Sequence, residues 1–137
     1  MNPNFYCYLN GRYMPLGEAS IALNDLGLLR ACGVFDYLRT YEGHPFKLKS
    51  HLQRLAHSAA FVNLALPHSL EEIAAIIEDL LYLRPDKSQD VALRLVLTGG
   101  LSEDGTRPRT AQLFYHYRRI ATNSGVVLHP GRKGAAL

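Results

Sequence analysis

The stretch that decides the fold reads Val34-Phe35-Asp36-Tyr37-Leu38-Arg39-Thr40-Tyr41-Glu42-Gly43, followed by Lys49-Ser50-His51-Leu52-Gln53-Arg54-Leu55-Ala56-His57-Ser58-Ala59-Ala60. Its first part is rich in aromatic and β-branched side chains, which predicts a strand over 34–41. Glu42-Gly43 predicts a turn into a second short strand over 45–47, which Pro45 places at a sheet edge or at the strand's start. Between residues 49 and 63 apolar side chains recur every three or four positions, which predicts a helix. Arg54 lies off its apolar stripe.

The flanking sequence completes an α+β pattern. Asn10-Gly11 predicts the turn of a β-hairpin, because this pair readily adopts positive φ angles. Ser69 and Glu72 predict a capping box that starts a second main helix ending near Leu83. Further expected elements are a strand over 20–23, a short helix or loop over 28–32, two central strands over 91–98 and 111–118, and a polar loop over 99–109 between them. Without βαβ alternation, we expect a small antiparallel or mixed sheet with two main helices.

Composition narrows the class of protein. A chain of 137 residues with 47% hydrophobic and 20% charged residues fits one globular domain. No apolar run is long enough to cross a bilayer, and the first residues lack a signal-peptide pattern, so we expect a cytoplasmic protein and no membrane partner. The net charge of +3 is scattered along the chain, which argues against a nucleic-acid partner.

Several kinds of catalytic site find no support in the sequence. The six histidines do not cluster at metal-ligand spacing, and Cys7 and Cys32 have no cysteine neighbour, so we expect no metal. Gly99-Gly100 is not followed by a phosphate-loop or dinucleotide-binding spacing. No G-x-S-x-G element occurs either.

The strand, turn, helix and arginine together, within a stretch from Tyr8 to Ile120, resemble the N-terminal half of class IV aminotransferases. These are fold-type IV pyridoxal 5′-phosphate enzymes, which include branched-chain and D-amino acid transaminases and aminodeoxychorismate lyase. The resemblance implies that residues 1–120 form the family's small domain and 121–137 an interdomain linker and atypical tail. It also implies a homodimer that acts on a small amino acid or 2-oxo acid.

Arg54 is the residue for which the resemblance implies cofactor binding, as the group that grips the cofactor phosphate. A guanidinium suits a phosphate dianion because it can donate two parallel charge-assisted hydrogen bonds. The alternative is a solvated arginine on the polar side of an amphipathic helix. If Arg54 binds phosphate, replacing it by alanine is expected to weaken cofactor affinity with little change in thermal stability.

Three further residues are candidates for substrate binding by resemblance: Phe35, Tyr37 and Arg94. Phe35 matches an aromatic of the substrate pocket and favours an apolar pocket of the branched-chain type, although an ordinary core aromatic is the alternative. Tyr37 lies two residues on, hence on the same face of the strand, and would narrow that pocket. Arg94 matches an arginine near the substrate carboxylate; a structural ion pair is the alternative, since an arginine in an apolar strand is costly unless paired.

The chain departs from the family in its catalytic lysine. Members need a lysine amine that forms an aldimine with the cofactor, and the segment that bears it has no match here. The flanks of Lys133 do not resemble it, so no catalytic residue is assigned and we expect the chain to be inactive alone. Asp36 stands where relatives have glutamate, and is expected to be structural. Arg107 and Arg109 lie in the loop that in the family approaches the partner's active site.

Three readings of function remain open from the sequence. The first is the N-terminal part of a pyridoxal-phosphate aminotransferase, with the branched-chain type favoured. The second is aminodeoxychorismate lyase, which uses the same scaffold to eliminate pyruvate. The third is a non-catalytic remnant that dimerises or binds an anion at Arg54.

Overall fold

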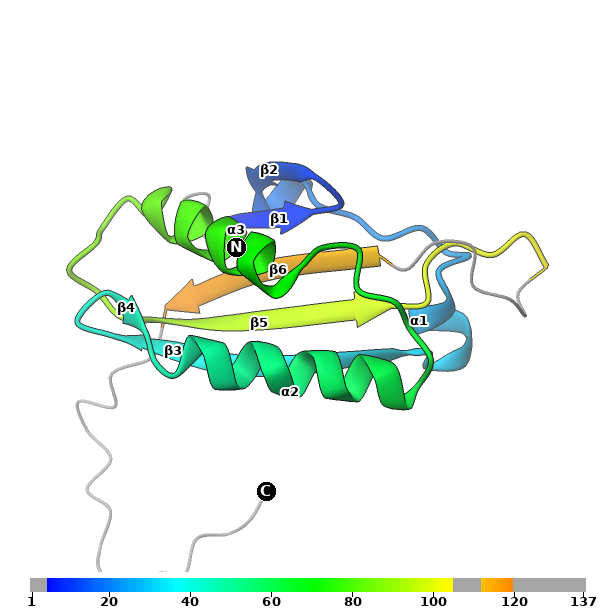
Figure 1. Ribbon diagram of the computed structural model, residues 1–137. Helices are drawn as coiled ribbons and strands as arrows, with labels where there is room; N and C mark the ends of the chain where they lie inside the picture. The colour runs from blue at the N-terminus through cyan, green and yellow to red at the C-terminus, as the bar shows by residue number, and fades with distance from the viewer. Residues whose placement is uncertain (1–4, 105–111, 120–137) are drawn as a thin grey trace, which may run out of the picture.

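A computed structural model of the chain describes residues 5–104 and 112–119, and shows one twisted sheet with helices packed on it (Figure 1). The six strands are β1 (Tyr6–Leu9), β2 (Arg12–Pro15), β3 (Gly33–Tyr41), β4 (His44–Pro45), β5 (Val91–Thr98) and β6 (Gln112–Arg119). They follow the order β2-β1-β6-β5-β3-β4, and every pairing between neighbours is antiparallel. The predicted α+β class is therefore confirmed.

Helices α2 (Leu48–Phe61) and α3 (Leu70–Tyr82) cover the same face of the sheet, whereas the short α1 (Leu26–Arg30) lies near one end of it (Figure 1). A single-turn 3₁₀ helix, Leu16–Glu18, follows β2. We call the face under α2 and α3 the inner face. Its side chains come from alternate positions of the strands, because successive residues of a strand point to opposite sides.

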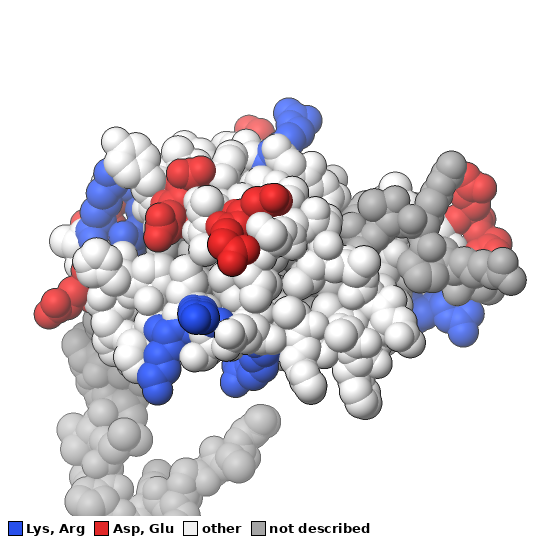
Figure 2. Space-filling model, in the orientation of Figure 1, with Lys and Arg blue, Asp and Glu red and all other residues white. Residues whose placement is uncertain are grey.

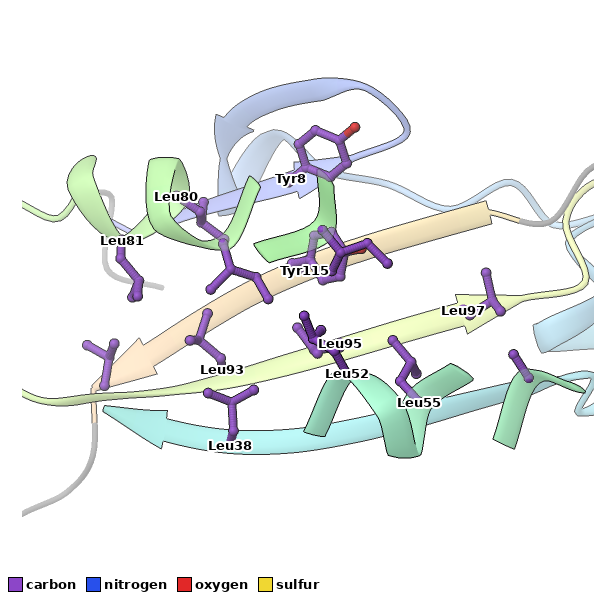
Figure 3. Packing of buried hydrophobic residues seen from close by; sticks show 14 of the residues in the cluster. Tyr8, Leu38, Leu52, Leu55, Leu80, Leu81, Leu93, Leu95, Leu97 and Tyr115 are labelled. Atoms are coloured by element: carbon purple, nitrogen blue, oxygen red, sulfur yellow. The ribbon is translucent and has the colours of Figure 1, made fainter. Parts of the chain in front are cut away.

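The core lies between the inner face and the two long helices (Figure 3). Leu93, Leu95 and Leu97 of β5 are fully buried and face the helices, whereas Arg94 between them is exposed. The helices contribute the apolar stripe that their sequence predicts, namely Leu52, Leu55 and Ala59 of α2 and Ile73, Ile77, Leu80 and Leu81 of α3.

Two local predictions differ from the structure. Residues 20–23 do not form a strand; this segment is exposed and leads into Asp25, which caps α1 by accepting a hydrogen bond from Gly27 N–H at 2.7 Å. Ser69 does cap α3, since its hydroxyl accepts from Glu72 N–H. The Glu72 carboxylate, however, accepts from His68 Nδ1 at 3.0 Å, so the reciprocal half of the capping box is absent.

Asp90 holds the turn between β3 and β4. Its carboxylate accepts hydrogen bonds from Thr40 Oγ1 at 2.8 Å and from the N–H groups of Gly43 and Glu42 at 3.1 and 3.3 Å. The bond from Gly43 is the leading cause that lowers the pKa of Asp90 below its ordinary value. The turn is thus tied to the start of β5 by one carboxylate.

Tyr115, at the centre of the core, carries a buried hydroxyl that has no hydrogen-bond partner among the described residues. Because an unpaired buried hydroxyl opposes folding, Tyr115→Phe is expected to raise the free energy of unfolding by about 1 kcal/mol. The matched control is Tyr8→Phe: the Tyr8 ring stacks on Tyr115, but its hydroxyl lies 3.3 Å from His68 Nε2, so this change should lower stability. Urea unfolding measures both, and a clear loss for Tyr115→Phe would contradict the prediction.

Candidate functional site

Arg54 is held by a buried carboxylate. Its Nε donates to Asp36 Oδ2 at 2.7 Å and its Nη2 to Asp36 Oδ1 at 3.0 Å, a bidentate ion pair. His51, one turn earlier on α2, lies with Nδ1 2.7 Å from Asp36 Oδ1. A carboxylate can only accept hydrogen bonds, so Nδ1 carries a proton here. Three elements of one polar cluster are therefore connected through Asp36, which is 3% exposed.

The course of β3 explains why Asp36 is available to α2. Beyond residues 40 and 41, which pair with β4, the described part of β3 has a strand partner on one side only, β5. On the open side Tyr37 N–H donates to Asp36 Oδ1 at 2.8 Å. The side chain of Asp36 thus satisfies the free edge of β3 and binds the two residues of α2 that face it.

The Arg54 side chain remains 65% exposed although two of its N–H groups bind Asp36. No other hydrogen bond of Arg54 occurs within residues 5–104 and 112–119, so its remaining donors are available to a ligand. Helix α2 contains no acidic residue, whereas α3 carries Glu71, Glu72, Glu78 and Asp79. On the face shown in Figure 2, acidic side chains accordingly gather over α3 and basic ones near the start of α2. The surroundings of Arg54 on its own helix favour an anion.

Burial by itself raises the pKa of Asp36, but the hydrogen bonds from Arg54, His51 and Tyr37 N–H outweigh it and hold this pKa below its ordinary value. A carboxyl whose pKa is lower in the folded chain stabilises it fully above the unfolded pKa of about 3.9 and loses this contribution as the pH falls below it. We expect acidification below about pH 5 to destabilise the wild type more steeply than Asp36→Asn. Urea unfolding across this range tests it; equal slopes would show that Asp36 is not coupled to folding.

Phe35, Tyr37 and Arg94, the three residues predicted for substrate binding, lie together on the outer face of the sheet. Arg94 pairs with Tyr37 across β3 and β5, and its guanidinium carbon lies 5.9 Å from the centre of the Phe35 ring and 5.8 Å from that of Tyr37. Phe35 is 65% exposed, so it is not a core aromatic. Arg94 makes no ion pair in the described chain and escapes the cost of burial because it faces outward.

A pocket of about 400 Å³ adjoins this cluster on the side of α1. Its walls are mostly apolar, with Phe35, Val96, Ile21 and Leu28 among the lining residues. At its polar end the Thr98 hydroxyl donates to the buried carboxylate of Asp25 at 2.9 Å, so both groups are already satisfied. The pocket therefore suits an apolar group more than a charged one.

Sequence reasoning assigned Arg54 but missed its link to Asp36 and His51. The signal was present, because His51 and Arg54 are three residues apart on a helix and hence on one side of it. That this side faces the edge of β3 requires the tertiary structure. Arg107, Arg109 and Lys133 lie outside the described residues. Within that part of the chain, no group of His, Cys, Asp or Glu side chains could hold a metal ion, and no helix could span a membrane.

Solved structures share this fold. The branched-chain aminotransferase of Thermoproteus uzoniensis superposes with a TM-score of 0.74 at 24% identity, over 85% of this chain and 41% of its own. The α+β architecture is that of the N-terminal domain of fold-type IV aminotransferases. The sequence agrees, since the family model for amino-transferase class IV matches residues 33–125. The chain belongs to the class IV aminotransferases.

Two curated relatives show how the family divides in function. A putative branched-chain-amino-acid aminotransferase of Methanocaldococcus jannaschii is 37% identical over 102 residues, which are 74% of this chain and 35% of the relative. Aminodeoxychorismate lyase of Bacillus subtilis is 36% identical over 98 residues, 72% of this chain and 33% of the relative. The chain thus spans about a third of the length of these relatives.

Proposed function

We propose that this chain forms the N-terminal part of a pyridoxal-phosphate-dependent aminotransferase, which moves an amino group between an amino acid and a 2-oxo acid. The observation that carries the proposal is Arg54: an exposed arginine with unused donors, held by a buried carboxylate on a helix without acidic residues. Class IV membership supports it, and two solved relatives contain a phosphopyridoxyl group or pyridoxamine 5′-phosphate.

Arg54 suits the cofactor's phosphate because a guanidinium offers parallel donors and keeps its charge at any ordinary pH. When bound, pyridoxal phosphate supplies the electron sink for amino-group transfer. The role of Arg54 is to bind and orient the phosphate. No residue of this chain is assigned as the lysine that carries the cofactor.

The outer face would receive the substrate. Arg94 presents a free guanidinium to a carboxylate, and Phe35 and the adjoining pocket present apolar walls to a side chain. A ligand that contacts both Arg54 and this cluster must lie across the open edge of β3, because Asp36 points inward whereas Phe35 and Tyr37 point outward. The apolar walls support a branched-chain or similar amino acid as the substrate.

Cofactor binding is the direct test. Equilibrium dialysis should show pyridoxal 5′-phosphate binding at least about tenfold more tightly than pyridoxal, which lacks the phosphate, since charge-assisted hydrogen bonds carry the difference. Inorganic phosphate should compete. Equal affinities for the two compounds would contradict the proposal.

Borohydride reduction with peptide mapping addresses the lysine. After incubation with pyridoxal 5′-phosphate, we expect no stoichiometric adduct on any one lysine. A stoichiometric adduct on Lys133 would instead show that this chain carries its own cofactor and that the assignment of no catalytic lysine is wrong.

A second candidate, aminodeoxychorismate lyase, is supported by the Bacillus subtilis relative, which is nearly as similar as the putative aminotransferase. Release of pyruvate from aminodeoxychorismate by the parent enzyme, without a 2-oxo acid acceptor, would favour the lyase. A remnant without catalysis would bind phosphate at Arg54 and turn over neither substrate. The proposal also includes a cytoplasmic homodimer, as the family resemblance suggests, and sedimentation of the chain as a monomer would argue against the dimer.

A further inference from the structure

The carboxylate of Asp36 leaves itself no freedom. Its Oδ1 accepts from Tyr37 N–H, His51 Nδ1 and Arg54 Nη2, and its Oδ2 accepts from Arg54 Nε, all within 3.0 Å. A short side chain with four hydrogen bonds from a strand and a helix occupies one orientation. Whatever binds Asp36 through a bidentate contact is therefore oriented as well.

An arginine without such a partner samples many rotamers, and a ligand that immobilises one rotamer-rich side chain loses about 0.5–1.5 kcal/mol in conformational entropy. In this chain the bidentate contact meets that cost on folding, before any ligand arrives. The donors not used by Asp36 remain exposed and stay in a fixed place relative to α2 and the edge of β3.

We propose that Asp36 and His51 are positioning residues for Arg54: they hold its guanidinium in one orientation that presents the remaining N–H groups to a phosphate-bearing ligand. This inference rests on the proposed function, in which Arg54 is the phosphate ligand. Neither Asp36 nor the Asp36-bound nitrogen of His51 contacts the phosphate in this arrangement.

Electrostatics makes the proposal distinguishable from a simple charge effect. Asp36 is an anion beside the site, so its negative charge by itself repels a phosphate. Removing the charge without disturbing Arg54 would strengthen phosphate binding. A positioning role predicts the opposite sign, because the loss of the bidentate contact frees the guanidinium.

The test compares Asp36→Asn with Asp90→Asn, using pyridoxal 5′-phosphate and inorganic phosphate as probes. Both aspartates are anchored by several hydrogen bonds at β3, but Asp90 has no contact with Arg54. We expect Asp36→Asn to bind pyridoxal 5′-phosphate about 2- to 10-fold more weakly and pyridoxal without change, from the ordering cost of one arginine. Asp90→Asn should leave both affinities as in the wild type. Unchanged or tighter phosphate binding by folded Asp36→Asn would overturn the proposal.

His51 supplies an independent arm that survives if Asp36→Asn fails to fold. His51→Leu removes the donor to Asp36 and should weaken phosphate binding in the same direction, whereas His51→Asn retains a donor near the place of Nδ1 and should restore it. Equal affinities for these two variants would count against a positioning role for His51.

Failure of the inference and failure of the proposed function give different patterns. If Arg54→Ala weakens phosphate binding while Asp36→Asn and His51→Leu do not, Arg54 is the ligand and positioning is refuted. If Arg54→Ala itself has no effect, the phosphate site is elsewhere and both are refuted.

Discussion

Replacing Arg54 by alanine is expected to weaken the binding of pyridoxal 5′-phosphate by about 10- to 100-fold, because charge-assisted hydrogen bonds to the phosphate are lost. Pyridoxal, which has no phosphate, should bind the variant and the wild type equally. The measurement is a direct titration of each compound with each protein, and the ratio of the two affinities is the quantity that reports on Arg54.

Lys49→Ala is the matched control for this prediction. Lys49 lies on the same helix, is exposed and carries the same charge, so its loss changes the net charge of α2 equally without removing the candidate ligand. If both variants lose affinity to the same extent, a general positive field attracts the phosphate and the specific role of Arg54 is contradicted.

Thermal stability separates the structural and the binding roles of Arg54. Sequence reasoning expects it to change little in Arg54→Ala, but the ion pair with buried Asp36 changes this expectation, since the variant leaves a buried carboxylate with fewer partners. We now expect a lower melting temperature as well as a lower affinity. Affinity must therefore be measured well below the melting temperature of the variant.

Leu93→Ala is expected to cause the largest loss of stability, about 2–5 kcal/mol in the free energy of unfolding, because it creates a cavity in a close-packed core. Leu93 is fully buried in β5, in the middle of the sheet and under the long helices (Figure 3). Denaturation by urea measures the change.

The control for the core prediction is Leu23→Ala, in the segment before α1. Leu23 is 82% exposed, so the same change of side chain should leave the free energy of unfolding within about 0.5 kcal/mol of the wild type. Similar losses in the two variants would mean that the described core does not carry the stability of the chain.

Much of the fold could be predicted because periodicity and burial coincide. The strand over 91–98 and the apolar stripes of the two long helices are found where the sequence predicts them, since each buries the side that is apolar. The segment 20–23 fails for the same reason: its apolar residues suggest a strand, but no neighbouring strand pairs with it and its side chains stay exposed. Local composition does not say whether a pairing partner exists.

The candidate site divides in the same way. The sequence by itself determined which residues can do the chemistry: Arg54 for a phosphate, Arg94 for a carboxylate, and Phe35 with Tyr37 on one face of a strand, because these depend on side-chain type and local period. Only the tertiary structure decided that Asp36 reaches Arg54 and His51 across the open edge of β3, and that Arg94 of β5 stands beside Phe35 and Tyr37. Such contacts join elements far apart in sequence, and they are set by strand order, register and helix packing, which no local pattern contains.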